Sequence, residues 1–109
     1  MIEPPKRRDE DSLLWACTDL DGTLAYSIHP KEGIGEPIWK NIGKLNELVE
    51  VGYKIVIHTS RHWSDYEMIE QWIEFHNIPT TKIVCGKPLA KFYIDDKAIN
   101  AKADKWYEY

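Results

Sequence analysis

The stretch Trp15-Ala16-Cys17-Thr18-Asp19-Leu20-Asp21-Gly22-Thr23-Leu24 begins with an apolar run and then places two carboxylates two positions apart. In a β-strand, residues i and i+2 point to the same side. A strand that ends near Asp19 therefore lets the carboxylates of Asp19 and Asp21 approach one point, and Gly22 allows the sharp turn that follows. Convergent carboxylates at a strand end suit a hard divalent cation and a phosphate group.

Two simpler interpretations of this stretch are open. A calcium loop of the EF-hand type needs oxygen ligands at its first, third and fifth positions and glycine at its sixth. Counted from Asp19, the fifth position is Thr23, but the sixth is Leu24, and no helix pattern precedes the loop. An ordinary Asx turn at the end of a strand is the second alternative for the segment taken alone. The interpretation therefore depends on residues downstream.

Length and composition favour one small domain. The 109 residues suffice for a modest core, and we expect a polar N-terminal arm at residues 1–11 and a single domain at residues 12–109. No apolar run approaches the ~20 residues of a membrane helix, and the polar start is not a signal peptide. The net charge of −4 argues weakly against a nucleic-acid partner without excluding one. Cys17 and Cys85 lie in apolar runs, which predicts buried, reduced thiols and a cytoplasmic protein.

Hydrophobic periodicity predicts strands that alternate with helices. The expected strands are Leu13–Thr18, Lys54–Thr59, Lys82–Cys85 and Phe92–Ile94. One helix should open at Glu36-Pro37 and end at Gly52, and another should begin at the Ser64–Glu67 capping box and stop at Asn77. This order predicts an α/β fold, a three-layer Rossmann-like sandwich with a short, about four-stranded parallel sheet. Residues Asn100–Tyr109 form either a last helix or a tail whose aromatic side chains pack down.

In such sheets, ligands collect beyond the carboxyl ends of the strands. The polar residues expected there are Asp19 and Asp21, Thr59-Ser60-Arg61, Gly86-Lys87-Pro88 and Asp95-Asp96. Carboxylate, hydroxyl, ammonium and a carboxylate pair together fit phosphoryl transfer through an aspartyl phosphate. Each of these residues also has an ordinary structural interpretation when it is taken alone. Thr59 could cap a helix, Lys87 could be a surface lysine, and Asp95-Asp96 could be a charge pair at a helix N-terminus. The functional hypothesis depends on the joint pattern.

These four segments resemble, in order, the four motifs of the haloacid dehalogenase-like (HAD) superfamily of phosphohydrolases. The resemblance covers roughly Leu13–Asn100, and Asp-x-Asp-Gly-Thr matches the superfamily signature residue for residue. Thr-Ser-Arg after the second strand, with Gly-Lys-Pro leading to Tyr-Ile-Asp-Asp, is similar to the small members without a cap domain. The resemblance implies an HAD-type fold and a Mg²⁺-dependent phosphatase that hydrolyses a phosphate monoester through an aspartyl-phosphate intermediate.

The resemblance also implies a role for each matching residue. Asp19 would be the nucleophile, and Asp21 would protonate the leaving group and then activate water. Thr59 would hydrogen-bond the phosphoryl oxygens, and Lys87 would hold the nucleophile and phosphate charges together. The residues expected to contact substrate are Gly22, Thr23, Ser60 and Arg61. The expected magnesium ligands are Asp19, the backbone carbonyl of Asp21, and Asp96, helped by Asp95.

The motif spacing leaves no room for a cap domain, because one helix fills the interval from Arg61 to Lys87. An uncapped site is open to water unless a large substrate or another subunit covers it. We therefore expect either a macromolecular phosphate ester or a homo-oligomer that uses the C-terminal tail or the Tyr26–Gly35 loop. A phosphotransferase of the same fold is one alternative. A non-hydrolytic phosphoacceptor, as in receiver domains, is another, although those domains place the acidic pair first and the lysine last.

Overall fold

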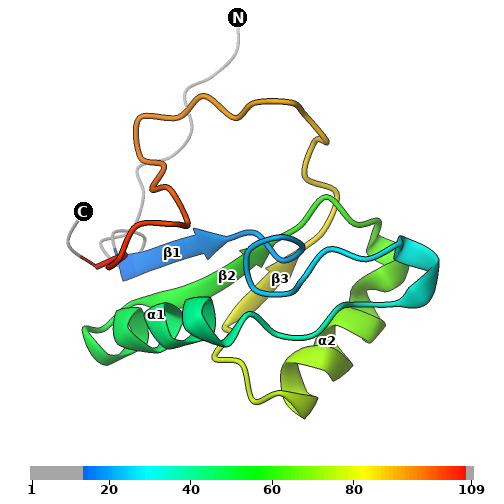
Figure 1. The fold of residues 1–109 in the computed structure, drawn as a ribbon, viewed down its shortest axis with the longest axis horizontal. Helices are drawn as coiled ribbons and strands as arrows, with labels where there is room; N and C mark the ends of the chain where they lie inside the picture. The colour runs from blue at the N-terminus through cyan, green and yellow to red at the C-terminus, as the bar shows by residue number, and fades with distance from the viewer. Residues whose placement is uncertain (1–13, 108–109) are drawn as a thin grey trace, which may run out of the picture.

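Three short parallel strands, in the order β1-β2-β3, form the sheet at the centre of the fold (Figure 1). They are β1 (Trp15–Thr18), β2 (Lys54–His58) and β3 (Lys82–Val84). Cys17 pairs with Val56, and Ile57 pairs with Ile83. Three consecutive apolar residues of the central strand, Ile55, Val56 and Ile57, are all buried. Because successive side chains of a strand point to opposite faces, both faces of this strand are covered. The predicted α/β class with a parallel sheet is confirmed.

The computed structural model describes residues 14–107, so the arm expected at residues 1–11 and Tyr109 lie outside the described residues. Two α-helices, α1 (Trp39–Glu50) and α2 (Tyr66–Phe75), connect the strands. Both lie on the same side of the sheet in Figure 1, as right-handed crossovers between successive neighbouring strands predict. Within the described residues, the second helical layer of a three-layer sandwich is not formed. No helix in this part of the chain is long and apolar enough to cross a membrane.

The first helix begins later than predicted but ends as predicted. Pro37 does not open it, because this residue forms an isolated bridge with Ala25 before the helix starts at Trp39. The buried apolar residues of the helix follow at helical spacing and are Ile42, Leu45 and Leu48. The helix ends just before Gly52, whose φ of +104° lies in the left-handed region that favours glycine.

The second helix is preceded by a 3₁₀ turn, η3 (Trp63–Asp65), which replaces the predicted Ser64–Glu67 capping box. The imidazole Nδ1 of His62 accepts the backbone N–H of Ser64 at 3.1 Å and so caps this turn. No side chain caps the first residue of α2. The helix stops at Phe75, two residues before the predicted stop at Asn77, which has a positive φ of 55°.

The C-terminal residues 101–107 are a packed tail, the second of the two predicted alternatives. Trp106 is 7% exposed and belongs to the hydrophobic core. Its indole N–H donates to the carbonyl of Ala101 at 3.2 Å, and the ammonium of Lys44 on α1 donates to the same carbonyl at 3.2 Å. We call this group of Lys44, Ala101 and Trp106 the tail clasp. It fixes the end of the described chain against α1.

The predicted fourth strand is not part of the sheet. Residues 88–100, which we call the outer loop, leave the end of β3 and arch away from the sheet before they return towards the tail (Figure 1). Phe92, Tyr93 and Ile94 are 73%, 50% and 99% exposed. A three-residue apolar run indicates a strand but does not specify its pairing partner, and no strand of this sheet pairs with it. The sheet therefore has three strands, and β1 is an edge strand.

The cysteine prediction is wrong at one position. Cys85 is buried, and its burial raises the pKa of the thiol, with a further contribution from the charge of Asp65. Cys17 is exposed, because the edge position of β1 leaves part of this strand without a neighbour. A cysteine in an apolar run was expected to be internal, but the outer loop does not cover this strand.

Candidate active site

Asp19 follows directly on β1, where its side chain is partly buried at the carboxyl end of the sheet. Carboxylate oxygen Oδ1 accepts the backbone N–H of Leu20 at 2.9 Å. This contact orients the side chain. Among the described residues no group hydrogen-bonds Oδ2, so one oxygen of Asp19 is available to a ligand.

The turn after Asp19 is fixed by backbone hydrogen bonds to a single carbonyl. The Leu20 carbonyl accepts the N–H groups of Thr23, Leu24 and Ala25 at 3.2, 2.8 and 3.1 Å. Gly22 has a φ of +83°, a conformation that residues with a Cβ rarely adopt. The side chains of Leu20 and Leu24 are fully buried and anchor the turn in the core. The sharp turn predicted at Gly22 is therefore present, and backbone hydrogen bonds and buried leucines hold it.

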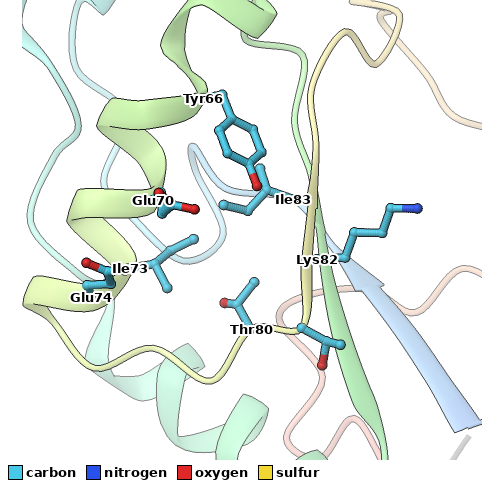
Figure 2. A pocket seen from close by; sticks show the side chains of 8 residues that line it. Tyr66, Glu70, Ile73, Glu74, Thr80, Lys82 and Ile83 are labelled. Atoms are coloured by element: carbon cyan, nitrogen blue, oxygen red, sulfur yellow. The ribbon is translucent and has the colours of Figure 1, made fainter.

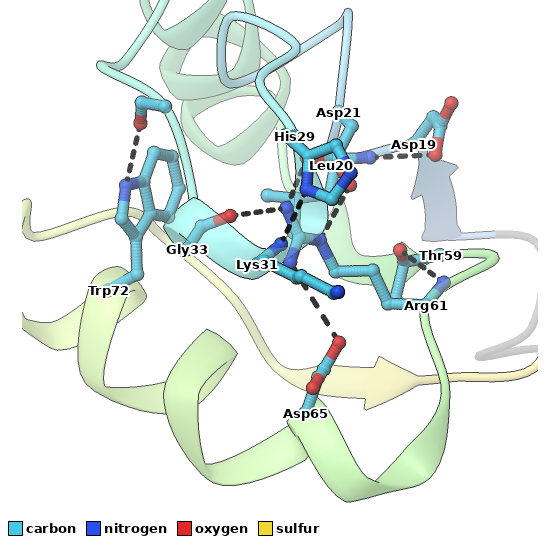
Figure 3. Close-up of polar contacts among 11 residues, drawn as sticks. Asp19, Leu20, Asp21, His29, Lys31, Gly33, Thr59, Arg61, Asp65 and Trp72 are labelled. Carbon is cyan, nitrogen blue, oxygen red and sulfur yellow. Dashed lines mark hydrogen bonds and ion pairs between the residues drawn. The ribbon is translucent and has the colours of Figure 1, made fainter.

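Asp21 is held by a buried arginine from the end of β2, as Figure 3 shows. Arg61 donates from Nε to Oδ2 and from Nη2 to Oδ1 of Asp21, each at 2.8 Å. Nη2 also donates to the Gly33 carbonyl at 2.8 Å. The hydrogen bond to Asp21 raises the pKa of the Arg61 guanidinium, against the lowering effect of burial. Two parallel N–H···O bonds fix the orientation of both planar groups.

Thr59 lies at the end of β2 and is 1% exposed. Its Oγ1 accepts the backbone N–H of Arg61 at 3.1 Å. Its carbonyl accepts the backbone N–H of Lys87 at 2.9 Å, and its own N–H donates to Val84. The ends of β2 and β3 are thus joined, which places Lys87 beside Thr59 in the backbone. Ser60, which lies between Thr59 and Arg61 in the sequence, is exposed.

Comparison with known proteins relates the fold of this chain to a solved structure. No protein-family model and no curated protein matches the chain. The crystal structure of an MCSG target from Vibrio cholerae matches it at 31% identity with a TM-score of 0.67, over 80% of this chain and 83% of that chain. The chain belongs to the family of this Vibrio protein. The match shows a shared fold for most of the chain.

The remaining predicted residues lie on or next to the outer loop. The Lys87 ammonium lies 4.1 Å from the centroid of the Tyr93 ring, in cation–π geometry. The hydroxyl of Tyr93 donates to the carbonyl of Pro88 and so folds the loop onto itself. Asp95 and Asp96 are exposed, and Asp95 accepts the backbone N–H of Lys97 at 2.8 Å. Among the described residues, no hydrogen bond or ion pair joins Asp95 or Asp96 to Asp19, Asp21 or Thr59.

The described side chains fit a magnesium ion only in part. Mg²⁺ takes oxygen ligands in octahedral geometry and keeps several waters, with one or two carboxylates. Asp19 offers one suitable oxygen, and Asp21 would contribute its backbone carbonyl, since Arg61 holds both of its carboxylate oxygens. Within residues 14–107 no group of three or more His, Cys, Asp or Glu side chains lies close enough together to hold a metal. Asp96 would complete such a site only after movement of the outer loop.

Sequence reasoning missed the residues that hold the loop after the first motif. Arg61 reaches the Gly33 carbonyl, and the indole N–H of Trp72 on α2 donates to the Gly35 carbonyl at 3.1 Å. A Cβ at Gly35 would lie 2.0 Å from the carbonyl oxygen of Tyr26, so only glycine fits there. Trp72 is also a buried core residue of α2. The position of Trp72 in the sequence did not indicate its hydrogen bond to Gly35.

A separate pocket of about 190 Å³ lies between α2 and β3 (Figure 2). Tyr66, Glu70 and Glu74 line it from the helix, and Thr80 and Lys82 line it from the segment that enters β3. None of the residues that line this pocket belongs to the candidate site. The pocket therefore contributes nothing to the site around Asp19.

Proposed function

We propose that the chain is a capless phosphatase of the HAD type, which hydrolyses a phosphate monoester through an aspartyl phosphate on Asp19. The observation that carries the proposal is the rigid strand-end turn, with Asp19 presenting one available oxygen beside a second, separately held carboxylate on Asp21. The buried Thr59 at the neighbouring strand end supports it. Parallel sheets place their ligands at this edge.

The described residues can divide the reaction into two displacements. An Asp19 oxygen attacks phosphorus, and the bond from phosphorus to the leaving oxygen breaks as Asp21 donates a proton to that oxygen. Water then attacks phosphorus, Asp21 takes the water proton, and the bond from Asp19 to phosphorus breaks to release phosphate. Because Thr59 Oγ1 accepts the N–H of Arg61, its hydroxyl hydrogen can donate to a phosphoryl oxygen.

The same proposal includes a four-stranded arrangement in which residues 92–94 lie parallel to β1. Three features support it: β1 is an edge strand, Cys17 on it is exposed, and Phe92 and Ile94 are exposed apolar side chains. Pairing of residues 92–94 with β1 would remove their apolar side chains from water and would cover the open edge of that strand. It would bring Asp95 and Asp96 to the strand end that carries Asp19. A bound Mg²⁺ held there would neutralise the phosphate charge that repels a carboxylate nucleophile.

A cross-linking experiment tests this closure. If Asp95 comes level with Asp19, Tyr93 comes opposite Cys17, since both pairs are 76 residues apart (95 − 19 = 93 − 17). The variant Tyr93→Cys should therefore be joined to Cys17 by dibromobimane, a short thiol cross-linker, within one chain on a denaturing gel. Leu89→Cys, which is 89% exposed but out of register, is the matched control. Equal cross-linking in both variants would contradict the closure, and a product of twice the mass would show strand exchange between two copies.

Turnover and metal dependence test the activity itself. With Mg²⁺ present, the protein should release many phosphates per chain from p-nitrophenyl phosphate, and EDTA should stop the release until Mg²⁺ is restored. Ca²⁺ should support little turnover, because its larger and looser coordination shell misplaces the nucleophile. Release of at most one phosphate per chain would favour the phosphoacceptor alternative. Full activity in EDTA, or rescue by Zn²⁺ alone, would contradict the magnesium assignment.

A further inference from the structure

Arg61 is the most constrained charged side chain near the candidate site. It is 8% exposed, and its guanidinium connects three segments that are far apart in sequence. Nε and Nη2 bind Asp21, and Nη2 also binds the Gly33 carbonyl. Nη1 lies 3.8 Å from Asp65 and makes no hydrogen bond among the described residues. The backbone N–H of Arg61 is bound to Thr59, so its main chain is fixed as well.

This geometry is unsuited to phosphate binding. An arginine that clamps a phosphoryl group presents two parallel donors of its fork to the ligand. In this protein the Nε–Nη2 edge already faces Asp21 in that manner, and burial keeps the remaining nitrogen from water. Arg61 can therefore meet substrate only by breaking a bidentate ion pair, whereas Ser60 beside it is exposed.

We propose that Arg61 is a positioning residue, which acts on the reaction through Asp21 and makes no contact with the phosphoryl group. The inference rests on the proposed function, because it requires Asp21 to carry protons. By holding both oxygens of Asp21, Arg61 fixes the plane of the carboxylate relative to Asp19. Through Gly33 it holds the Tyr26–Gly35 loop against the same carboxylate. Each carboxylate oxygen accepts one bond from Arg61 and keeps a second lone pair, and we place the exchanged proton of Asp21 there.

The inference has a kinetic signature that depends on the leaving group. An ester of a poor leaving group, such as glycerol 2-phosphate, needs the proton from Asp21 more than acetyl phosphate does. Arg61→Gln should therefore lower kcat on glycerol 2-phosphate by about 10²-fold, but should lower formation of the phosphoenzyme from acetyl phosphate only a few-fold. KM should stay within about threefold of the wild-type value on both substrates, since Arg61 makes no binding contact with either of them. Arg61→Lys should not restore kcat, because an ammonium cannot form the two parallel bonds.

A kinetic double-mutant cycle separates positioning from a folding defect. If Arg61 acts only through Asp21, Arg61→Gln should have no further effect on kcat in an Asp21→Asn background. A loss of the same size in both backgrounds would indicate general distortion and would overturn the inference. Asp65→Asn, which removes only the 3.8 Å neighbour of Nη1, is the matched control and should keep kcat. Circular dichroism should give the native spectrum for each variant.

Two further outcomes distinguish this inference from the proposed function. If Arg61→Gln kept the kcat of the wild type but raised KM about tenfold or more on every ester, Arg61 would be a residue that binds the phosphate group. That result would refute the positioning role and leave the proposed function intact. Rescue of that KM by Arg61→Lys would have the same meaning. Wild-type protein that releases phosphate from none of the esters would refute the proposed function, and the positioning role with it.

Discussion

Replacing Asp19 with asparagine should reduce phosphate release from p-nitrophenyl phosphate to the detection limit, a loss of several orders of magnitude. An amide oxygen is a much weaker nucleophile than a carboxylate oxygen, and it carries no charge to share with a metal. Asparagine keeps the shape of the side chain, and its Oδ1 can still accept the Leu20 N–H that orients Asp19. The measurement is the steady-state release of p-nitrophenol at saturating Mg²⁺.

The controls for this substitution follow from the structure. Asp104→Asn changes an exposed carboxylate in the C-terminal tail and should retain wild-type turnover. Asp19→Asn should give the wild-type circular dichroism spectrum, because the hydrogen bonds of the turn come from the Leu20 carbonyl. If Asp19→Asn retained about a tenth of the activity, covalent catalysis by this residue would be refuted.

Replacing Asp21 with asparagine should slow turnover by about 10²–10⁴-fold, because both leaving-group protonation and water attack lose their proton carrier. The two steps separate with acetyl phosphate, whose leaving group needs little protonation. With this substrate Asp21→Asn should accumulate phosphoenzyme, since the first displacement still occurs while water attack is slow. Mass spectrometry of acid-quenched protein should show the added mass of one phosphoryl group.

Asp19→Asn treated in the same way is the control for this trapping and should show no added mass. Asp21→Asn also leaves Arg61 with a neutral partner, and an uncompensated buried charge destabilises a fold. Thermal unfolding of the variant should therefore be compared with that of the wild type. Normal turnover with no added mass would contradict the role of Asp21 as proton carrier.

The sequence predicted the elements best where the hydrophobic pattern was long. The strand at Lys54–His58 and the helix at Trp39–Glu50 were found because their apolar residues are buried by neighbours on both sides or along one face. Phe92–Ile94 gave an equally apolar signal, but a run of three residues does not encode its partner. The exposure of Cys17 follows from the same missing pair.

The candidate site was predicted unevenly for a related reason. The positions of Asp19, Asp21 and Thr59 follow from strand ends, which periodicity locates well. The direction of a long side chain does not follow from its position, so the sequence did not predict that Arg61 pairs with Asp21. Asp95 and Asp96 depend on where the outer loop lies, and local sequence does not specify that.

The tail clasp has a consequence for how the outer loop can move. One end of the loop is fixed at the end of β2, where the N–H of Lys87 donates to the Thr59 carbonyl, and the other is fixed to α1 through Lys44 and Ala101. A segment tethered at both ends meets its own chain at an effective concentration that reaches the millimolar range for short flexible links. A second molecule at micromolar concentration competes poorly with that local excess. Lys44→Ala would weaken one tether, although Trp106 stays in the core, and so would shift the balance towards exchange between molecules.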